Sequence, residues 1–403
     1  MAGARSRIPH RVPLLAHSFR PFFLLAAIQA ATSILVWLPA FYGELSLSSA
    51  FAPRDWHVHE MLYGFLPAVI TGFLFTAIPN WTGRLPIQGT PLATLATVWL
   101  AGRIAVTCSA EIGWAFALAV DAAFLALVVA AALREIAAGK NWRNLPVVML
   151  VLLLLAGNVA FHLEAHIEGA ADDSVRAGIS VVVLLISLIG GRIIPSFTRN
   201  WLVKMNPGRV PVPFGRFDGG VIALSALALV CWIASPLSVV TGLAMALAGL
   251  LHVARLVRWA GDRTARERLL LILHIGYAFV PLGFLLHAAA AFGALPASAG
   301  IHAWMAGAAG VMTLAVMTRA SLGHTGQPLT ASAATHVIYA AIIVAALARV
   351  CAVVWPAHGD ALLHVAAFGW VTAFAGFAIA FGPLLVGGRW RALAIPRAAV
   401  PAR

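Results

Sequence analysis

The segment RDWHVHEMLYGF, residues 54–65, carries two histidines and a glutamate at the start of a long apolar run. Imidazole is the commonest side-chain ligand of transition metals and also binds haem iron, so His57 and His59 are candidate ligands. They are two residues apart, and on a continuous helix they would point about 200° from each other and could not bind one ion together. Either His57 folds back in the preceding loop, or each histidine serves a different centre.

Three segments repeat one spacing, in which a histidine is followed five residues later by a glycine. They are HEMLYG (His59, Gly64), HAWMAG (His302, Gly307) and HVAAFG (His364, Gly369). A glycine about one helical turn beyond a histidine removes the side chain where a flat ring would lie, which suits a porphyrin. The alternative is that small residues only let helices pack closely.

The elements that must position these residues are transmembrane helices. Hydrophobic residues make up 62% of the 403 residues and charged residues only 10%, a balance typical of chains that cross a bilayer repeatedly. No run alternates with the period of two that a transmembrane barrel requires. We predict an all-α membrane protein in which the whole chain, 1–403, is one polytopic domain. Its twelve predicted spans lie near residues 21–40, 60–79, 91–108, 114–133, 145–165, 177–195, 219–235, 238–257, 269–292, 300–318, 332–355 and 361–386.

Charge placement predicts the orientation of these spans, because short cytoplasmic loops hold an excess of Lys and Arg. With the N-terminus inside, twelve spans place most of the 27 basic residues on the cytoplasmic side and most of the 14 acidic residues at or near the outer face. Both termini are then cytoplasmic. The net charge of +13 reflects this topology and attraction to anionic lipid, so we expect the bilayer, and no nucleic acid, as a partner.

The predicted orientation places seven histidines from five spans at one level near the outer face. They are His57, His59, His162, His166, His287, His302 and His364. Ionisable residues at membrane depth usually have a function. We expect His59, His302 and His364 to converge there, with His287 or His162 close enough to share a metal ion or a ring.

Two arginines, Arg103 and Arg349, lie inside predicted spans, in their outer halves. They would pair with the carboxylates of a bound haem, or, as a structural alternative, Arg103 would pair with Asp121. A looser group of histidines lies toward the cytoplasmic face, and for it we favour a structural role over a second cofactor or a quinone head group. This group consists of His274, His324 and His336.

Several chemistries lack their motifs. The three cysteines, Cys108, Cys231 and Cys351, are dispersed, and the chain has no CxxCH for covalent haem and no CxxC pair for zinc or redox chemistry. Any haem is therefore held without a covalent bond, as haem b. The chain also has no Walker loop, so transport driven by nucleotide hydrolysis is not expected.

Five strings resemble the signatures of the NnrS family, from about His17 to the last span. They are HSFRPFFLLAA, WHVHEMLYGF, NWTGR, GGRIIPSFTRNWL and MTRASLGHTG. The chain departs from that pattern with Ser18 in place of proline and Gln327 in place of arginine. The resemblance implies a polytopic protein of the bacterial inner membrane that holds haem and copper and is linked to nitric oxide and nitrosative stress. Its implied ligands stand inside matching motifs and are His57, His59, His302 and His324.

Two function classes follow. In the first, the outer histidines hold haem b and copper, and the protein binds or acts on nitric oxide or its metal-nitrosyl products, with quinol as an electron source. We then expect His59 to be the axial haem ligand, His57 to lie on the copper side and Glu60 to face the outer polar region. The alternative is a twelve-helix secondary transporter whose histidines couple protons or substrate, with its site near the bilayer midplane. The level of the histidines near one face favours the first class.

Overall fold

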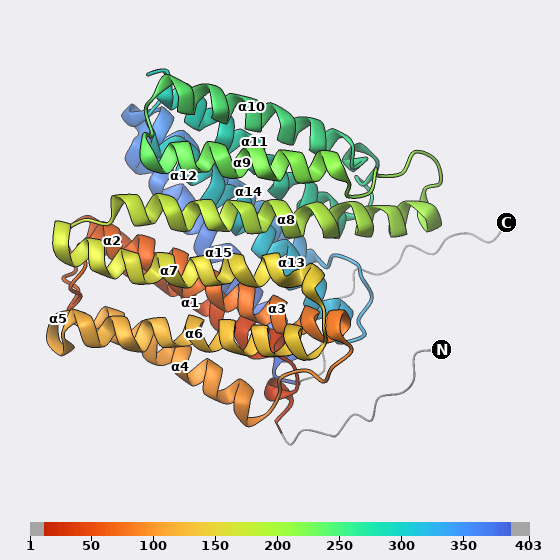
Figure 1. Cartoon of the computed structure of the whole chain (residues 1–403), viewed down its shortest axis with the longest axis horizontal. Coiled ribbons are helices and arrows are strands. Elements are labelled where there is room, and N and C mark those ends of the chain that lie inside the picture. The colour runs from red at the N-terminus through yellow and green to blue at the C-terminus, as the bar shows by residue number, and fades with distance from the viewer. Residues whose placement is uncertain (1–11, 388–403) are drawn as a thin grey trace.

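The computed structural model describes residues 12–387, and in that range the chain is a bundle of long helices without strands (Figure 1). Ten of these are regular α-helices: α1 (Phe19–Phe41), α4 (Thr90–Thr107), α6 (Trp114–Ala138), α7 (Leu145–Glu168), α8 (Asp172–Met205), α9 (Arg216–Ala234), α10 (Val239–Val257), α11 (Arg268–Ala291), α14 (Ala333–Val354) and α15 (Gly359–Leu385). Two more are composite: α2 (Pro53–His59), η2 (Glu60–Phe65) and α3 (Leu66–Thr82) form one, and α12 (Ser298–His302), η5 (Ala303–Ala309) and α13 (Gly310–His324) form the other. The predicted fold class is confirmed.

Eleven of the helices within residues 12–387 are long and apolar enough to cross a membrane, and α4 is the predicted span outside that set. Nevertheless α4 runs the length of the bundle. The N–H of Gly89, just before α4, donates to the carbonyl of Leu15, and the hydroxyl of Ser49 donates to the carbonyl of Val106 near the end of α4. Since Leu15 and Ser49 flank opposite ends of the 23-residue helix α1, α4 connects the same two ends.

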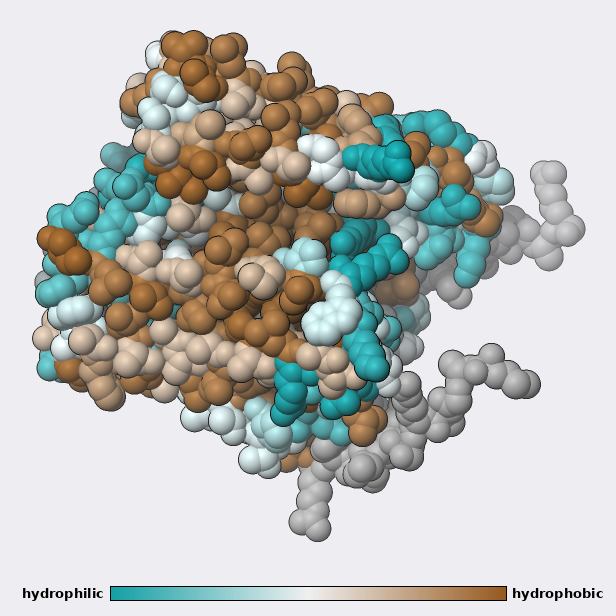
Figure 2. Space-filling view, in the orientation of Figure 1, coloured by the Kyte–Doolittle hydropathy of each residue, from teal (hydrophilic) through white to brown (hydrophobic). Residues whose placement is uncertain are grey.

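The surface matches that arrangement. Figure 2 shows a broad apolar belt over the middle of the helices, with hydrophilic residues gathered at the two ends of the bundle. Large apolar side chains point outward along this belt, among them Ile104 on α4 and Leu227 on α9, which are 58% and 63% exposed. An outward-facing apolar belt is the expected surface of a protein surrounded by lipid.

The two composite helices share an unusual local structure. In each, a π-helical segment begins directly after a histidine, η2 after His59 and η5 after His302. A π-helical turn inserts extra residues into the helix, which changes the faces presented before and after it, and such turns are frequent at functional sites. The side chain of Trp99 donates a 2.9 Å hydrogen bond to the carbonyl of Gly64 inside η2, which satisfies one backbone group of this irregular segment.

Candidate functional site

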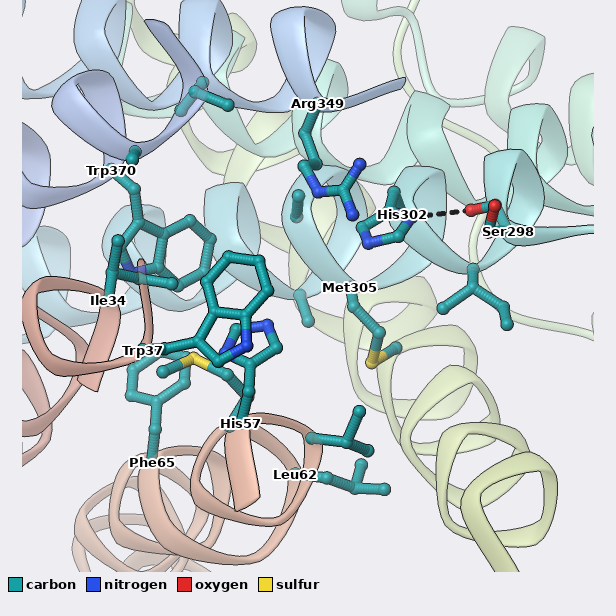
Figure 3. Close-up of a pocket in the computed structure, with 18 of the residues that line it drawn as sticks. Ile34, Trp37, His57, Leu62, Phe65, Ser298, His302, Met305, Arg349 and Trp370 are labelled. Atoms are coloured by element: carbon teal, nitrogen blue, oxygen red, sulfur yellow. Dashed lines mark hydrogen bonds between the residues drawn. The ribbon is translucent and has the colours of Figure 1, made fainter. Parts of the chain in front are cut away.

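A cavity of about 360 Å³ lies where the two composite helices approach each other. Its wall comes from α1, α2, η2, the start of α3, α8, α12, η5, α14 and α15, and most of the lining side chains are apolar. Inside the cavity two imidazoles and a guanidinium interrupt this lining, those of His57, His302 and Arg349 (Figure 3), and a second guanidinium, that of Arg54, lies at its edge. Arg54 and Phe41, both largely exposed, line the cavity where it reaches one end of the bundle.

The ring of His302 is fixed by its own helix. Its Nδ1 donates a 2.7 Å hydrogen bond to the carbonyl oxygen of Ser298, one turn earlier (Figure 3). Because a carbonyl can only accept, Nδ1 carries the proton and Nε2 keeps its lone pair. This is the arrangement found in most metal-binding histidines, where the second ring nitrogen is held by a backbone or carboxylate oxygen. His302 is therefore prepared to bind a metal through Nε2.

His57 faces the same cavity from α2. Its ring stacks on the indole of Trp37 with centroids 4.2 Å apart and planes inclined by 26°. Its Nδ1 is buried and has no hydrogen-bond partner within residues 12–387. A buried polar atom without a partner is costly, so His57 has an unused ligand or donor atom at this site.

Arg349 supplies positive charge to the cavity. Its guanidinium lies beside the ring of His302 (Figure 3), and it forms no ion pair with any acidic side chain in the described part of the chain. Charges removed from water are normally paired. An anionic group on a ligand in the cavity would provide that missing partner. The thioethers of Met61 and Met305 line the same space.

A second cluster lies beside the cavity and is completely buried. It consists of His59 on α2, Asp121 on α6 and His162 on α7, whose ligand atoms all lie within 4.8 Å of one another. Asp121 Oδ2 is 3.2 Å from His59 Nε2 and 3.3 Å from His162 Nε2. Two ligands each about 2.0 to 2.1 Å from a tetrahedral ion are about 3.3 Å apart, so these spacings fit a shared metal ion. We call this cluster the His59–Asp121–His162 triad.

Four further polar side chains surround the triad. Arg103 on α4 forms an ion pair with Asp121 and donates a 2.6 Å hydrogen bond to Glu60 Oε1. Glu60 also accepts from Gln29, and it lies 3.6 Å from His59 Nδ1. Asn158 donates to Asp121 Oδ2 at 2.7 Å and places its own Oδ1 2.9 Å from His59 Nε2. These groups fix the orientation of the triad.

This network corrects one prediction and decides another. Glu60 was expected to face the outer polar region, but it is only 1% exposed, because Arg103 and Gln29 hold its carboxylate inside the bundle. The ion pair between Arg103 and Asp121, predicted as the structural alternative, is confirmed. His57 and His59 have different surroundings, since His57 lines the cavity and His59 belongs to the triad, so the two rings do not face one common ion.

The expected convergence of His59, His302 and His364 does not occur. His302 lines the cavity, and His59 lies in the triad, where His162 joins it. His364 is exposed, and its ring stacks on Tyr42 at 5.5 Å. His287 is buried in a third place, between the indoles of Trp232 and Trp304. The four histidines therefore lie in different surroundings, because each helix turns its histidine toward a different neighbour.

The three glycines of the repeated spacing were expected to leave space for a flat ring, but neighbouring atoms already fill the space beside each of them. A Cβ at Gly64 would lie 2.7 Å from Arg103 Nη1, and one at Gly307 would lie 2.3 Å from Phe279 Cδ1. A Cβ at Gly369 would lie 2.9 Å from the carbonyl oxygen of Ala341 on α14. None of the three lines the cavity. Each glycine accommodates a neighbouring side chain or helix, which was the alternative prediction.

The histidines predicted to lie toward the cytoplasmic face, His274, His324 and His336, make contacts that fit the structural role favoured for them. His274 Nε2 is 3.0 Å from the hydroxyl of Thr198, and the ring of His324 lies 5.5 Å from that of Phe19. His336 donates through Nδ1 to the carbonyl of Ser332. The three cysteines are free and dispersed.

Several residues of the site were not predicted. Gln29 and Asn158 complete the buried network, and each is a polar residue inside an apolar run, which is a recognisable signal in a transmembrane helix. Trp37, Met61 and Met305 line the cavity, and no pattern distinguished them from ordinary apolar residues of a span.

Comparison with known proteins agrees with the motifs. A family model described as NnrS protein matches residues 13–389, nearly the whole chain. No protein with curated function matches the sequence. The chain therefore belongs to the NnrS family and is a multi-pass membrane protein of the nitric oxide response.

Proposed function

We propose that this protein binds haem b in the cavity and copper at the His59–Asp121–His162 triad, and that nitric oxide binds at the haem. The observation that carries the proposal is the combination of two imidazoles and an unpaired arginine in one apolar cavity. The proposed location is the bacterial inner membrane.

The residues of the cavity fit a haem. A macrocycle needs apolar walls, iron needs an imidazole nitrogen, and the propionates need positive charge. His302 offers Nε2 because Ser298 holds its other nitrogen, and Arg349 lacks an acidic partner among the described residues. His57, whose Nδ1 has no partner among the described residues, would be a further imidazole ligand of the iron or would donate a hydrogen bond to a molecule bound there. When bound, haem would supply the iron to which an uncharged diatomic gas attaches.

The residues of the triad fit a transition metal. Two imidazole nitrogens and one carboxylate oxygen are a suitable donor set for copper, iron or zinc. Glu60 lies near His59 Nδ1, which is the position of a carboxylate that orients a ligand histidine. This assignment reverses the one expected from the sequence, in which His59 was the haem ligand and His57 lay on the copper side.

Binding of the gas is proposed in preference to steady turnover. Turnover requires an electron donor such as quinol, and the contacts of His274 with Thr198 and of His324 with Phe19 fit the structural role that we favoured for these histidines over a quinone site. The transporter alternative has no specific support, since the polar groups inside the cavity, His57, His302 and Arg349, lie near the ends of their spans.

An optical spectrum of the purified, reduced protein tests the proposal. We expect a Soret band that shifts on addition of nitric oxide or carbon monoxide. His302→Ala should lower the ratio of haem to protein and His57→Ala should change the shift. His364→Ala is the matched control, because His364 makes the same bond to a carbonyl four residues earlier but is exposed outside the cavity. A colourless protein after expression with ample haem, or equal haem content in all three variants, would overturn the proposal.

A further inference from the structure

A second, smaller space, which we call the apolar slot, borders the cavity. The slot has a volume of about 100 Å³ and lies between η5 and the helices α3, α7, α8 and α13. It shares two wall residues with the cavity, Leu66 and Ala309, which are 5% and 1% exposed. These two side chains therefore stand at the boundary between the two spaces.

The slot extends the cavity along the helix axes. On α8, Val175 and Ile179 face the cavity, whereas Val182, Ile186 and Ile193 face the slot. Residues three or four positions apart lie on one face of a helix, so a single face of α8 lines both spaces. The helix rises about 20 Å from Ile179 to Ile193. The slot therefore leads from the level of the histidines deep into the apolar belt.

The chemistry of the slot restricts what it can hold. Thr313 is the only residue with a polar side chain among its described lining residues, and the hydroxyl of Thr313 already donates to the carbonyl of Gly310 at 2.9 Å. Apolar cavities of this kind stay dry and take up xenon or small apolar molecules. Since one water occupies about 30 Å³ in the liquid, the slot has room for a few diatomic molecules but not for a macrocycle.

The slot is also next to the lipid. Phe73, Ile189 and Val316 line it and are partly exposed. Uncharged gases dissolve in the hydrocarbon of a bilayer, which is where these partly exposed side chains lie.

We propose that the apolar slot binds small apolar gas molecules and conducts them from the bilayer to the cavity, with Leu66 and Ala309 as the constriction. The identity of the gas as nitric oxide rests on the proposed function. The competing route is the cavity mouth near Arg54 and Phe41, where a gas would arrive from the aqueous side.

Rebinding of carbon monoxide after flash photolysis, measured on the full-length reduced protein in lipid nanodiscs, tests the route. Ile186 lines the slot but not the cavity. Ile186→Trp should slow bimolecular rebinding roughly tenfold, equivalent to about 1.4 kcal/mol in the activation barrier, and Ile186→Ala should accelerate it. Haem content and the equilibrium Soret band should be unchanged in both. The control is Leu227→Trp, which adds the same bulk on the lipid-facing side of α9 and should leave the rate unchanged.

A second measurement does not depend on haem. Xenon under pressure should bind the wild-type protein in the slot, as observed by crystallography or by xenon NMR, and Ile186→Trp should abolish that binding. Xenon binding in a protein that holds no haem would refute the proposed function and leave the slot intact. Absence of xenon from the slot, or equal rebinding rates in the tryptophan and alanine variants, would overturn the inference.

Discussion

His57 and His59 are two residues apart on one helix, yet they face different sites. His57 stacks on Trp37 in the cavity wall, and His59 contacts Asp121 in the buried triad. The π-helical segment that begins at Glu60 then continues the cavity wall with Met61, Leu62 and Phe65. One short segment of sequence thus contributes a histidine to each of two candidate centres. The two centres can therefore be tested separately by mutation.

The first prediction uses this separation. His162→Ala removes one of three ligands from the triad without changing a side chain of the cavity, so copper content should fall while the Soret band stays near the wild-type intensity. His166→Ala is the control, because His166 lies one turn away and stacks on Trp114 at 4.0 Å outside the triad. Metal analysis and an optical spectrum of the same preparation measure both quantities. Equal loss of haem and copper in His162→Ala would contradict two separate sites.

The second prediction concerns Arg349, whose substitution should have opposite effects on the two forms of the protein. Arg349→Leu removes a charge-assisted hydrogen bond worth about 1.5 to 3 kcal/mol to a propionate, so haem affinity should fall by roughly tenfold or more. In the haem-free protein the same change removes an unpaired charge from a half-buried position, and the thermal unfolding temperature should rise. Arg349→Lys keeps the charge and should retain most of the affinity. Unchanged haem affinity in Arg349→Leu would exclude a propionate from this position.

The number and order of the helices could be predicted because each span carries its own signal, a long apolar run bounded by polar residues. The segment ASPLS, residues 234–238, is an example: the predicted spans 219–235 and 238–257 meet there, and in the structure α9 ends at Ala234 and α10 begins at Val239. Pairing of the histidines could not be predicted in the same way. Contact between side chains depends on how each helix is rotated about its axis. The π-helical segments η2 and η5 alter that rotation directly after His59 and His302. His364 shows the result, since it has the same spacing to a glycine as His59 and His302 but is exposed and stacks on Tyr42 outside both sites.

The third prediction compares two arginines that pair with carboxylates in different surroundings. Arg103 is 6% exposed and holds both Glu60 and Asp121, so Arg103→Met leaves two buried carboxylates without their cation. We expect a loss of about 3 to 5 kcal/mol in the free energy of unfolding. Arg134→Met is the control, because Arg134 is 67% exposed and its partner Glu135 keeps a second bond to Arg84, so the loss should be below about 1 kcal/mol. Unfolding in mixed micelles measures both values, and similar losses for the two variants would show that the network around Arg103 contributes little.

The last prediction tests whether α4 crosses the membrane, which decides between eleven and twelve spans. Gly89, at the start of α4, bonds to Leu15 at one end of the bundle, and Val106, near its end, bonds to Ser49 at the other. Single cysteines at positions 88 and 111, just before and just after α4, are introduced as Gln88→Cys and Glu111→Cys after replacement of the three native cysteines by serine, and they should react from opposite sides of the membrane. With the orientation predicted from the basic loops, a membrane-impermeant maleimide added to intact cells should label position 111, and position 88 should react only after the cells are opened. Reaction of both positions from the same side would show that α4 lies on the surface, and labelling of position 88 alone in intact cells would show that the predicted orientation is inverted.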